Sequence, residues 1–143
     1  MKILFYDTKN YDRESFNKQL VNYPGVEIDY LKGDLAPPSA VMATGYDAVC
    51  AFVSSDVGKE TLEVLDSHGV HLVLMRCAGF NNVDLETAAR LGIRVLRVPG
   101  YSPEAVADHA LMLALPANRH VHKSYGKVRE NDFSLGGLMG INF

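Results

Sequence analysis

The sequence contains little cysteine, no long hydrophobic run and no excess of charge of one sign. Its two cysteines, Cys50 and Cys77, are not in a CxxC spacing, and each lies in an apolar run. A thiol in such surroundings behaves as a small hydrophobic group, so we expect both to be buried and reduced. No stretch reaches the roughly 18 to 20 apolar residues of a membrane span, and the N-terminal apolar run is too short for a secretory signal. We therefore expect no membrane association and a cytoplasmic location.

The charges of the chain are close to balanced. Its 143 residues include 14 basic and 17 acidic ones, with a formal net charge of −3, and nucleic acid is therefore not an expected partner. A hydrophobic fraction of 48% and a charged fraction of 22% are typical of a soluble globular domain. Basic residues gather near the end of the chain, at Arg119, Lys123, Lys127 and Arg129. We interpret them as a solvated helix face.

Short apolar runs recur along residues 1–100. They are KILFYD (2–7), VEIDYL (26–31), AVCAFV (48–53), HLVLMR (71–76) and IRVLRV (93–98). Runs that are apolar at both odd and even positions are typical of parallel sheets covered on both faces. Helical patterns separate the runs: Asp84 is a natural N-cap, Gly92 can end the helix that follows it, and residues 33–45 have room only for a short helix. The sequence thus predicts an α/β fold with a flavodoxin-like, doubly wound parallel sheet of five strands.

A long helix is predicted after the fifth strand. Ser102 is a candidate N-cap, Pro103 occupies the favoured first helical position, and apolar residues then recur at helical spacing. Pro116 removes one backbone donor and crowds the preceding turn, so we expect a kink or break near residues 112–116. The glycine-rich tail, residues 131–143, is interpreted as a linker.

The candidate site lies in the loops at the carboxyl ends of the strands, where open α/β sheets bind ligands. Ala78 and Gly79 follow the fourth strand, and their backbone N–H groups could hold a carboxylate. The alternative is a tight strand-to-helix turn that needs glycine. Tyr101 could donate its hydroxyl to an anion or could simply pack. We assign no catalytic residue and no metal site, because the five histidines show no metal-ligand spacing.

Several motifs occur together in one order along the chain. The stretch RCAGFNNVDLETAARLGIRVLRVPGYSPEAVADHA (76–110) is preceded by DAVCAFV (47–53) and followed by NRHVHKSYGKVRENDFSLGGL (118–138). Through these motifs nearly the whole chain resembles the D-isomer-specific 2-hydroxyacid dehydrogenases, and within them the fermentative D-lactate dehydrogenases.

The resemblance implies roles for individual residues. It places the substrate carboxylate at the loop of Ala78 and Gly79, and the substrate itself beside Phe52 and Tyr101. It places Val106 near the nicotinamide of NAD, at the N-terminus of the long helix, where free N–H donors suit a carboxamide. Core packing is the alternative for both Phe52 and Val106. In this interpretation residues 1–100 are the substrate-binding, catalytic domain, and residues 101–143 are the long crossover helix and linker that start a truncated dinucleotide-binding domain.

A dinucleotide-binding fingerprint is missing from the sequence. No GxGxxG spacing occurs, and the closely spaced Gly136, Gly137 and Gly140 do not fit it. In the family that the chain resembles, the catalytic arginine, glutamate and histidine follow that motif. We therefore expect an N-terminal fragment of an NAD-dependent D-lactate dehydrogenase. Such a fragment would bind NAD and small 2-oxo or 2-hydroxy acids weakly or not at all, and would not interconvert pyruvate and D-lactate alone.

The alternative is a non-catalytic, flavodoxin-like binding module or a regulatory pseudoenzyme. A signalling receiver is disfavoured, because Val53 and Ser54 stand where it needs an aspartate and no lysine follows the fifth strand. A pseudoenzyme would act through oligomerisation. The long helix would expose apolar residues for this, namely Leu111, Leu113, Leu115 and Val121. We expect a homo-oligomer that forms through residues 103–125.

Overall fold

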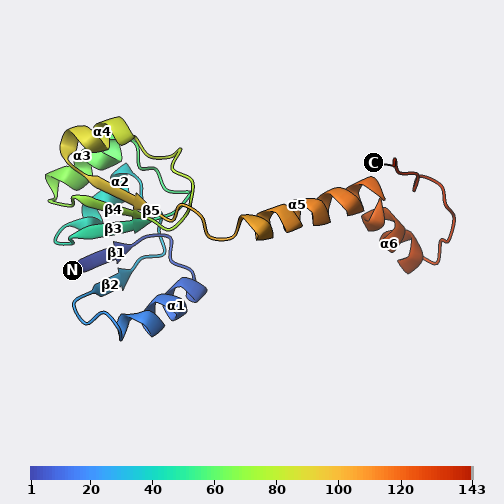
Figure 1. Cartoon of the computed structure of the whole chain (residues 1–143), viewed down its shortest axis with the longest axis horizontal. Coiled ribbons are helices and arrows are strands. Elements are labelled where there is room, and N and C mark those ends of the chain that lie inside the picture. Colours follow the sequence, from blue (N-terminus) through green and yellow to red (C-terminus); the bar gives the residue numbers. More distant parts are fainter. Residues whose placement is uncertain (143) are drawn as a thin grey trace. The chain divides into compact units, whose positions relative to one another are not determined.

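A parallel sheet forms the centre of the first of two compact units (Figure 1). The computed structural model describes residues 1–142, and its units are Met1–Pro99 and Gly100–Phe143. The strands are β1 (Lys2–Phe5), β2 (Glu27–Tyr30), β3 (Ala48–Ala51), β4 (Leu72–Met75) and β5 (Arg94–Arg97). Neighbouring strands pair in parallel in the order β2-β1-β3-β4-β5. The predicted five-stranded, flavodoxin-like sheet is confirmed.

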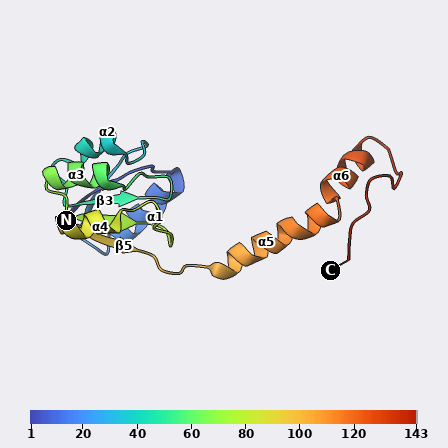
Figure 2. The same ribbon diagram turned by 90° about the horizontal axis from the view of Figure 1, so that it is seen from above.

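The helices of the first unit cover the two faces of the sheet unequally. They are α1 (Asn10–Leu20), α2 (Pro37–Ala40), the 3-10 helix η1 (Val41–Ala43), α3 (Lys59–Ser67) and α4 (Leu85–Leu91). Helices α2, α3 and α4 lie together on one face, whereas α1 lies apart from them (Figures 1 and 2). Residues 33–45 form only the short helices α2 and η1, as the sequence predicts.

The alternation of side chains along the strands explains why the first unit has two hydrophobic cores. Leu4 and Tyr6 belong to the larger core, together with residues of α2, α3 and α4. Ile3 and Phe5 belong to the smaller core, where Phe16 of α1 packs edge-on against Phe5 with ring centroids 5.0 Å apart. Successive residues of a strand face opposite sides of a sheet, so a run that is apolar at both parities supplies both cores.

Helix α4 begins and ends at the residues that the sequence predicts. The Asp84 carboxylate accepts a hydrogen bond from the Thr87 backbone N–H at 2.9 Å and from the Thr87 hydroxyl at 2.8 Å. These bonds satisfy a donor of the first helical turn. Gly92 follows the helix with a φ of +70°, a left-handed conformation that glycine adopts without steric cost.

The second unit contains the long helix α5 (Pro103–Asn118) and the shorter α6 (Val121–Arg129). Ser102 occupies the N-cap position of α5, but its side chain makes no capping hydrogen bond. The predicted break near residues 112–116 is wrong, because α5 continues through Pro116. Since no residue of α5 is buried, water can hydrate the Met112 carbonyl that Pro116 leaves without its donor. The chain turns only at His120, where φ is +51°.

The tail, predicted to be a linker, contains no helix or strand over residues 131–142. It is nevertheless attached to the second unit through Asn118. The Asn118 Nδ2 donates to the Ile141 carbonyl at 2.8 Å, and its Oδ1 accepts from the Ile141 N–H at 3.1 Å. These two bonds return the tail to the end of α5.

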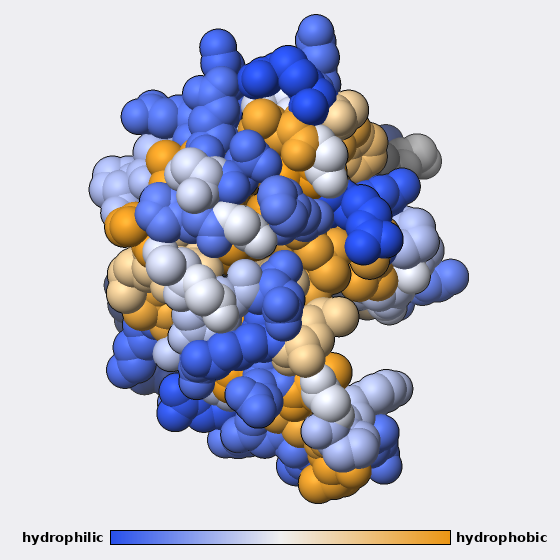
Figure 3. Space-filling view, turned by 90° about the vertical axis from the view of Figure 1, so that its left-hand side faces the viewer, coloured by the Kyte–Doolittle hydropathy of each residue, from blue (hydrophilic) through white to orange (hydrophobic). Residues whose placement is uncertain are grey.

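Hydrophilic and hydrophobic side chains are mixed on the surface (Figure 3). Within residues 1–142, no helix has both the length and the apolar character needed to cross a membrane. A cytoplasmic location stays a prediction.

Replacing Gly92 by alanine should lower the free energy of unfolding by about 1–2 kcal/mol, because a Cβ is disfavoured at positive φ. The matched control is Gly25→Ala, since a Cβ at either glycine would meet nothing within 4 Å but only Gly92 has a positive φ. The control should change the free energy of unfolding by less than about 0.5 kcal/mol. Urea denaturation followed by circular dichroism compares the two variants, and equal losses would contradict the conformation assigned to Gly92.

Candidate functional site

Four loops meet at the carboxyl edge of the sheet in the first unit. They follow β1, β3, β4 and β5, which are parallel and therefore end at the same edge (Figure 1). Phe52 follows β3 directly, and Ala78 and Gly79 lie in the loop after β4. Three residues that the sequence singles out thus belong to the edge where sheets of this kind bind ligands.

Arg76, directly after β4, fixes the loop that follows β1. Its Nη1 donates to the Tyr6 carbonyl at 3.0 Å, and its Nη2 donates to the Asp7 carbonyl at 2.7 Å. The carboxylates of Asp7 and Asp12 lie 3.7 and 3.8 Å from the guanidinium. The Arg76 side chain is only 11% exposed, and a buried charge is stable only when it is paired and hydrogen-bonded.

Asp7 has an uncommon backbone conformation at this edge. Its φ is +47°, in the left-handed region that aspartate tolerates better than most residues. The bond from Arg76 to the Asp7 carbonyl holds this conformation in place. The Asp7 carboxylate also pairs with the Lys9 ammonium and raises the pKa of Lys9 through that hydrogen bond.

The guanidinium of Arg76 also contacts two aromatic rings. Its Cζ lies 4.7 Å from the centroid of Phe5 and 4.4 Å from that of Phe52, distances at which a cation is attracted to the face of a ring. Phe52 is half-buried and packs against the larger core. The ring therefore has a packing role, and its contact with a substrate stays a prediction.

The loop after β4 is held by its carbonyl oxygens. The Arg97 guanidinium donates to the Ala78 carbonyl at 2.9 Å, the Val98 N–H donates to the Cys77 carbonyl at 3.1 Å, and the Cys77 thiol donates to the Gly79 carbonyl at 3.3 Å. No hydrogen bond formed within residues 1–142 uses the backbone N–H of Ala78 or Gly79 as its donor. The loop is thereby fixed while two of its N–H donors remain available to a ligand.

Gly79 has no structural requirement for glycine in the first unit. Its φ is not positive, and a Cβ built on it would meet nothing within 4 Å. The tight turn that needs glycine, the alternative considered for this position, is therefore not what the structure shows. Open space beside the Gly79 backbone is what a ligand needs to reach its N–H group.

Asn82 joins the loops after β3 and β4. Its Nδ2 donates to the carbonyls of Phe52 at 3.1 Å and Ser55 at 2.8 Å. The buried Ser55 hydroxyl in turn accepts from the Phe52 N–H at 3.1 Å. Sequence reasoning missed both Asn82 and Arg76 as organisers of this edge. The available signal for Arg76 was a charged residue at the end of an otherwise apolar strand.

Neither cysteine of the first unit is a nucleophile at neutral pH. Both are buried and unpaired, as the sequence predicts. Burial raises the pKa of Cys50 to about 12 and also raises the pKa of Cys77. A thiol reacts as its thiolate, so these two groups fill the core rather than carry chemistry.

The remaining predicted site residues, Tyr101 and Val106, belong to the second unit. Tyr101 precedes α5 and Val106 lies in its first turns, and both are exposed. Their contacts with a substrate and with a nicotinamide stay predictions. Among residues 1–142, no group of three or more histidine, cysteine, aspartate or glutamate side chains is arranged to hold a metal ion.

A sequence model of one protein family, described as "D-isomer specific 2-hydroxyacid dehydrogenase, catalytic domain", matches residues 3–135. The 2-hydroxyacid dehydrogenase homolog 1 of Schizosaccharomyces pombe is 48% identical over 140 residues, which are 98% of this chain and 42% of that protein. The D-lactate dehydrogenase of Escherichia coli is 44% identical over 141 residues, which are 99% of this chain and 43% of that protein. The chain thus spans about two fifths of the length of these relatives.

Solved structures show the same likeness. The apo-structure of D-lactate dehydrogenase from Escherichia coli matches with a TM-score of 0.79 at 44% identity, covering 99% of this chain and 44% of that one. The D-lactate dehydrogenase from Aquifex aeolicus, complexed with NAD and lactic acid, matches with a TM-score of 0.82 over 98% of this chain and 41% of that one. Its identity is 21%, so this second likeness shows the fold alone.

Removing the guanidinium with Arg76→Met should lower the free energy of unfolding by about 3–5 kcal/mol, because two buried carboxylates lose their partner. The control is Arg90→Met, which breaks an ion pair with Glu63 whose side chains are 56% and 45% exposed. That change should have an effect of less than about 1 kcal/mol, because solvent screens such pairs. Chemical denaturation at neutral pH measures both. If the two variants lose the same stability, Arg76 does not have the organising role given to it here.

Proposed function

The chain belongs to the D-isomer specific 2-hydroxyacid dehydrogenase family, and we propose that its first unit forms the carboxylate-binding half of a D-lactate dehydrogenase substrate site. The observation that carries the proposal is the loop after β4, whose carbonyls are hydrogen-bonded while the N–H groups of Ala78 and Gly79 have no partner within residues 1–142. Backbone N–H groups that point outward from a fixed loop hold carboxylates well.

The charges at this edge favour an anion. The Arg97 guanidinium is hydrogen-bonded to the Ala78 carbonyl and lies 5.1 Å from the centroid of the Phe80 ring. This places a positive charge next to the two free donors. A small 2-oxo or 2-hydroxy acid would set its carboxylate on the N–H groups of Ala78 and Gly79, with Phe52 and Tyr101 as neighbours of the substrate.

The residues of this chain do not fit NAD by themselves. A nicotinamide cofactor supplies the hydride in reactions of this kind, and its pyrophosphate usually lies on a glycine-rich loop between a strand and a helix. Gly136 and Gly137 lie in a segment with neither, over residues 131–142. We therefore propose that this chain binds and orients the acid but does not turn pyruvate over alone, and that Val106 approaches a nicotinamide only when a cofactor domain is present.

Oxamate, an unreactive analogue of a 2-oxo acid, should bind the protein at the loop after β4. In a titration followed by amide NMR, the signals of Ala78 and Gly79 should shift and saturate. The variant Gly79→Val should weaken this binding at least about tenfold, because its side chain would fill the space that the ligand needs. Gly25→Val, at a glycine with equally open surroundings, is the matched control and should bind as the unchanged protein does.

Two results would contradict this part of the proposal. Oxamate shifts that saturate equally in Gly79→Val would show that the acid binds elsewhere. A steady, protein-dependent loss of NADH absorbance after addition of pyruvate would refute the expected inactivity.

We further propose that copies of this chain associate through residues 103–125. No residue of α5 is buried within the second unit. Apolar side chains on this segment are about half exposed or more, namely Val106, Leu111, Met112, Leu113, Leu115 and Val121. Exposed apolar surface of this extent favours self-association.

Light scattering should show a mass above the 15.7 kDa of one chain, which falls to that of a monomer in the double variant Leu111→Glu, Leu115→Glu. These two residues are four apart and lie on one side of α5. Leu135→Glu, at an exposed leucine outside the helix, should leave the mass unchanged. A clean monomer for the unchanged protein at high concentration would rule the association out.

A further inference from the structure

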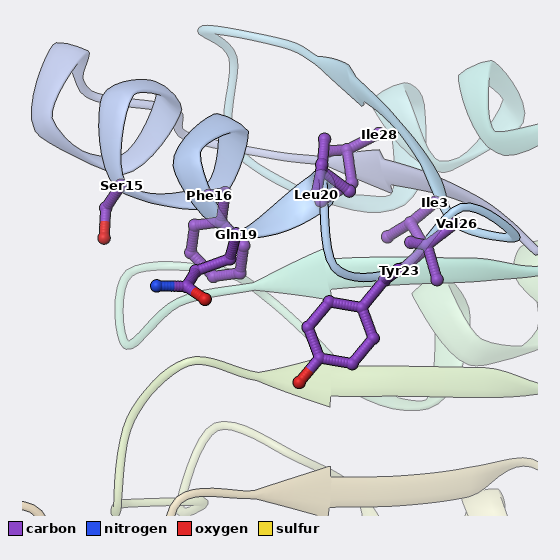
Figure 4. Close-up of a pocket in the computed structure, with 8 residues that line it drawn as sticks. All are labelled: Ile3, Ser15, Phe16, Gln19, Leu20, Tyr23, Val26 and Ile28. Carbon is purple, nitrogen blue, oxygen red and sulfur yellow. The ribbon is translucent and has the colours of Figure 1, made fainter.

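A cavity of about 320 Å³ lies between α1 and the strands β1 and β2, away from the loops at the carboxyl edge (Figure 4). Asp12 is the only buried residue of α1, so the helix buries no apolar side chain completely against the sheet. The space that the helix leaves is within the range of ligand sites, which hold roughly 300–1,000 Å³. Much smaller apolar cavities, of ~150 Å³, already bind a single aromatic ring.

The wall of this cavity is apolar and carries no charge. Its floor is formed by the branched side chains of Ile3, Val26 and Ile28, and Leu20 and Phe16 of α1 stand over them. The lining residues include no acidic and no basic side chain. A charged ligand would therefore lose its hydration without gaining a partner.

Neutral polar groups surround the mouth of the cavity. The polar ends of Ser15, Gln19 and Tyr23 point to the same side of α1 (Figure 4). Within residues 1–142, the hydroxyls of Ser15 and Tyr23 make no hydrogen bond, and Gln19 uses only its Oε1, which accepts from Asn22 at 3.5 Å. At least three hydrogen-bonding groups thus remain for a ligand.

Two aromatic rings border the same space. Phe16 is fixed from behind, because its ring meets that of Phe5 at an interplanar angle of 71°. Tyr23 is 60% exposed and extends from the segment that follows α1 (Figure 4). Rings in such positions attract a third aromatic ring in offset or edge-on contact.

We propose that this cavity is a binding site for a small, uncharged aromatic molecule that carries one hydrogen-bonding group, of the phenol class. The ring lies on the apolar floor between Phe16 and Tyr23. Its polar group exchanges hydrogen bonds with Gln19 and its neighbours at the mouth. The site is independent of the acid site proposed at the carboxyl edge, because the two share no residue.

The probe for this proposal is p-cresol, titrated into the full chain and followed by amide NMR. The signals of Ile3 and of residues 15–28 should shift and saturate, while those of Ala78 and Gly79 stay unchanged. Benzoate tests the exclusion of charge, and cyclohexanol tests the preference for an aromatic ring. Each should bind at least about tenfold more weakly than p-cresol.

The variant Gln19→Ala should weaken the binding of p-cresol about three- to tenfold, the effect of one lost hydrogen bond. Lys18→Ala is the control, because Lys18 is an exposed neighbour on α1 that does not line the cavity. It should leave the affinity unchanged.

The proposal fails if p-cresol produces no saturable shift over residues 15–28, or if benzoate or cyclohexanol binds as tightly. It also fails if the same signals move with protein concentration alone, because a second copy of the chain would then fill the cavity.

Discussion

The first unit depends on one buried interaction, the guanidinium of Arg76 at the end of β4. This group is hydrogen-bonded to the backbone of Tyr6 and Asp7, lies beside the carboxylates of Asp7 and Asp12, and contacts the ring of Phe52. A parallel sheet ends all its strands at one edge, where the loops have no ladder to hold them. The buried charge supplies that restraint, since it is stable only with every partner in place.

The restraint explains how the same edge can be both rigid and open to a ligand. The loop after β4 is held through the carbonyls of Cys77 and Ala78, and through the amide of Asn82 that reaches across to the loop after β3. The donors of Ala78 and Gly79 then face no partner of their own. In a member of the D-isomer specific 2-hydroxyacid dehydrogenase family, a preorganised pair of donors is suited to the carboxylate that all its substrates share.

Local sequence signals predicted much of the fold, because they act over a few residues. The five apolar runs and the ends of α4 at Asp84 and Gly92 depend on strand periodicity and cap chemistry alone. Arg76 and Asn82 were missed because their partners come from other loops and meet only after folding. At Pro116 the local rule failed, since a helix with no buried residue can leave one carbonyl to water.

The central claim is that the N–H groups of Ala78 and Gly79 are free donors on a fixed loop. Amide hydrogen exchange, measured residue by residue by NMR on the protein without ligand, tests it most directly. The account predicts fast exchange for these two amides and slow exchange for those of Arg76 and Val98, which are hydrogen-bonded to Ala51 and Cys77. Slow exchange at Ala78 and Gly79 would show that these donors are already occupied and would contradict the account.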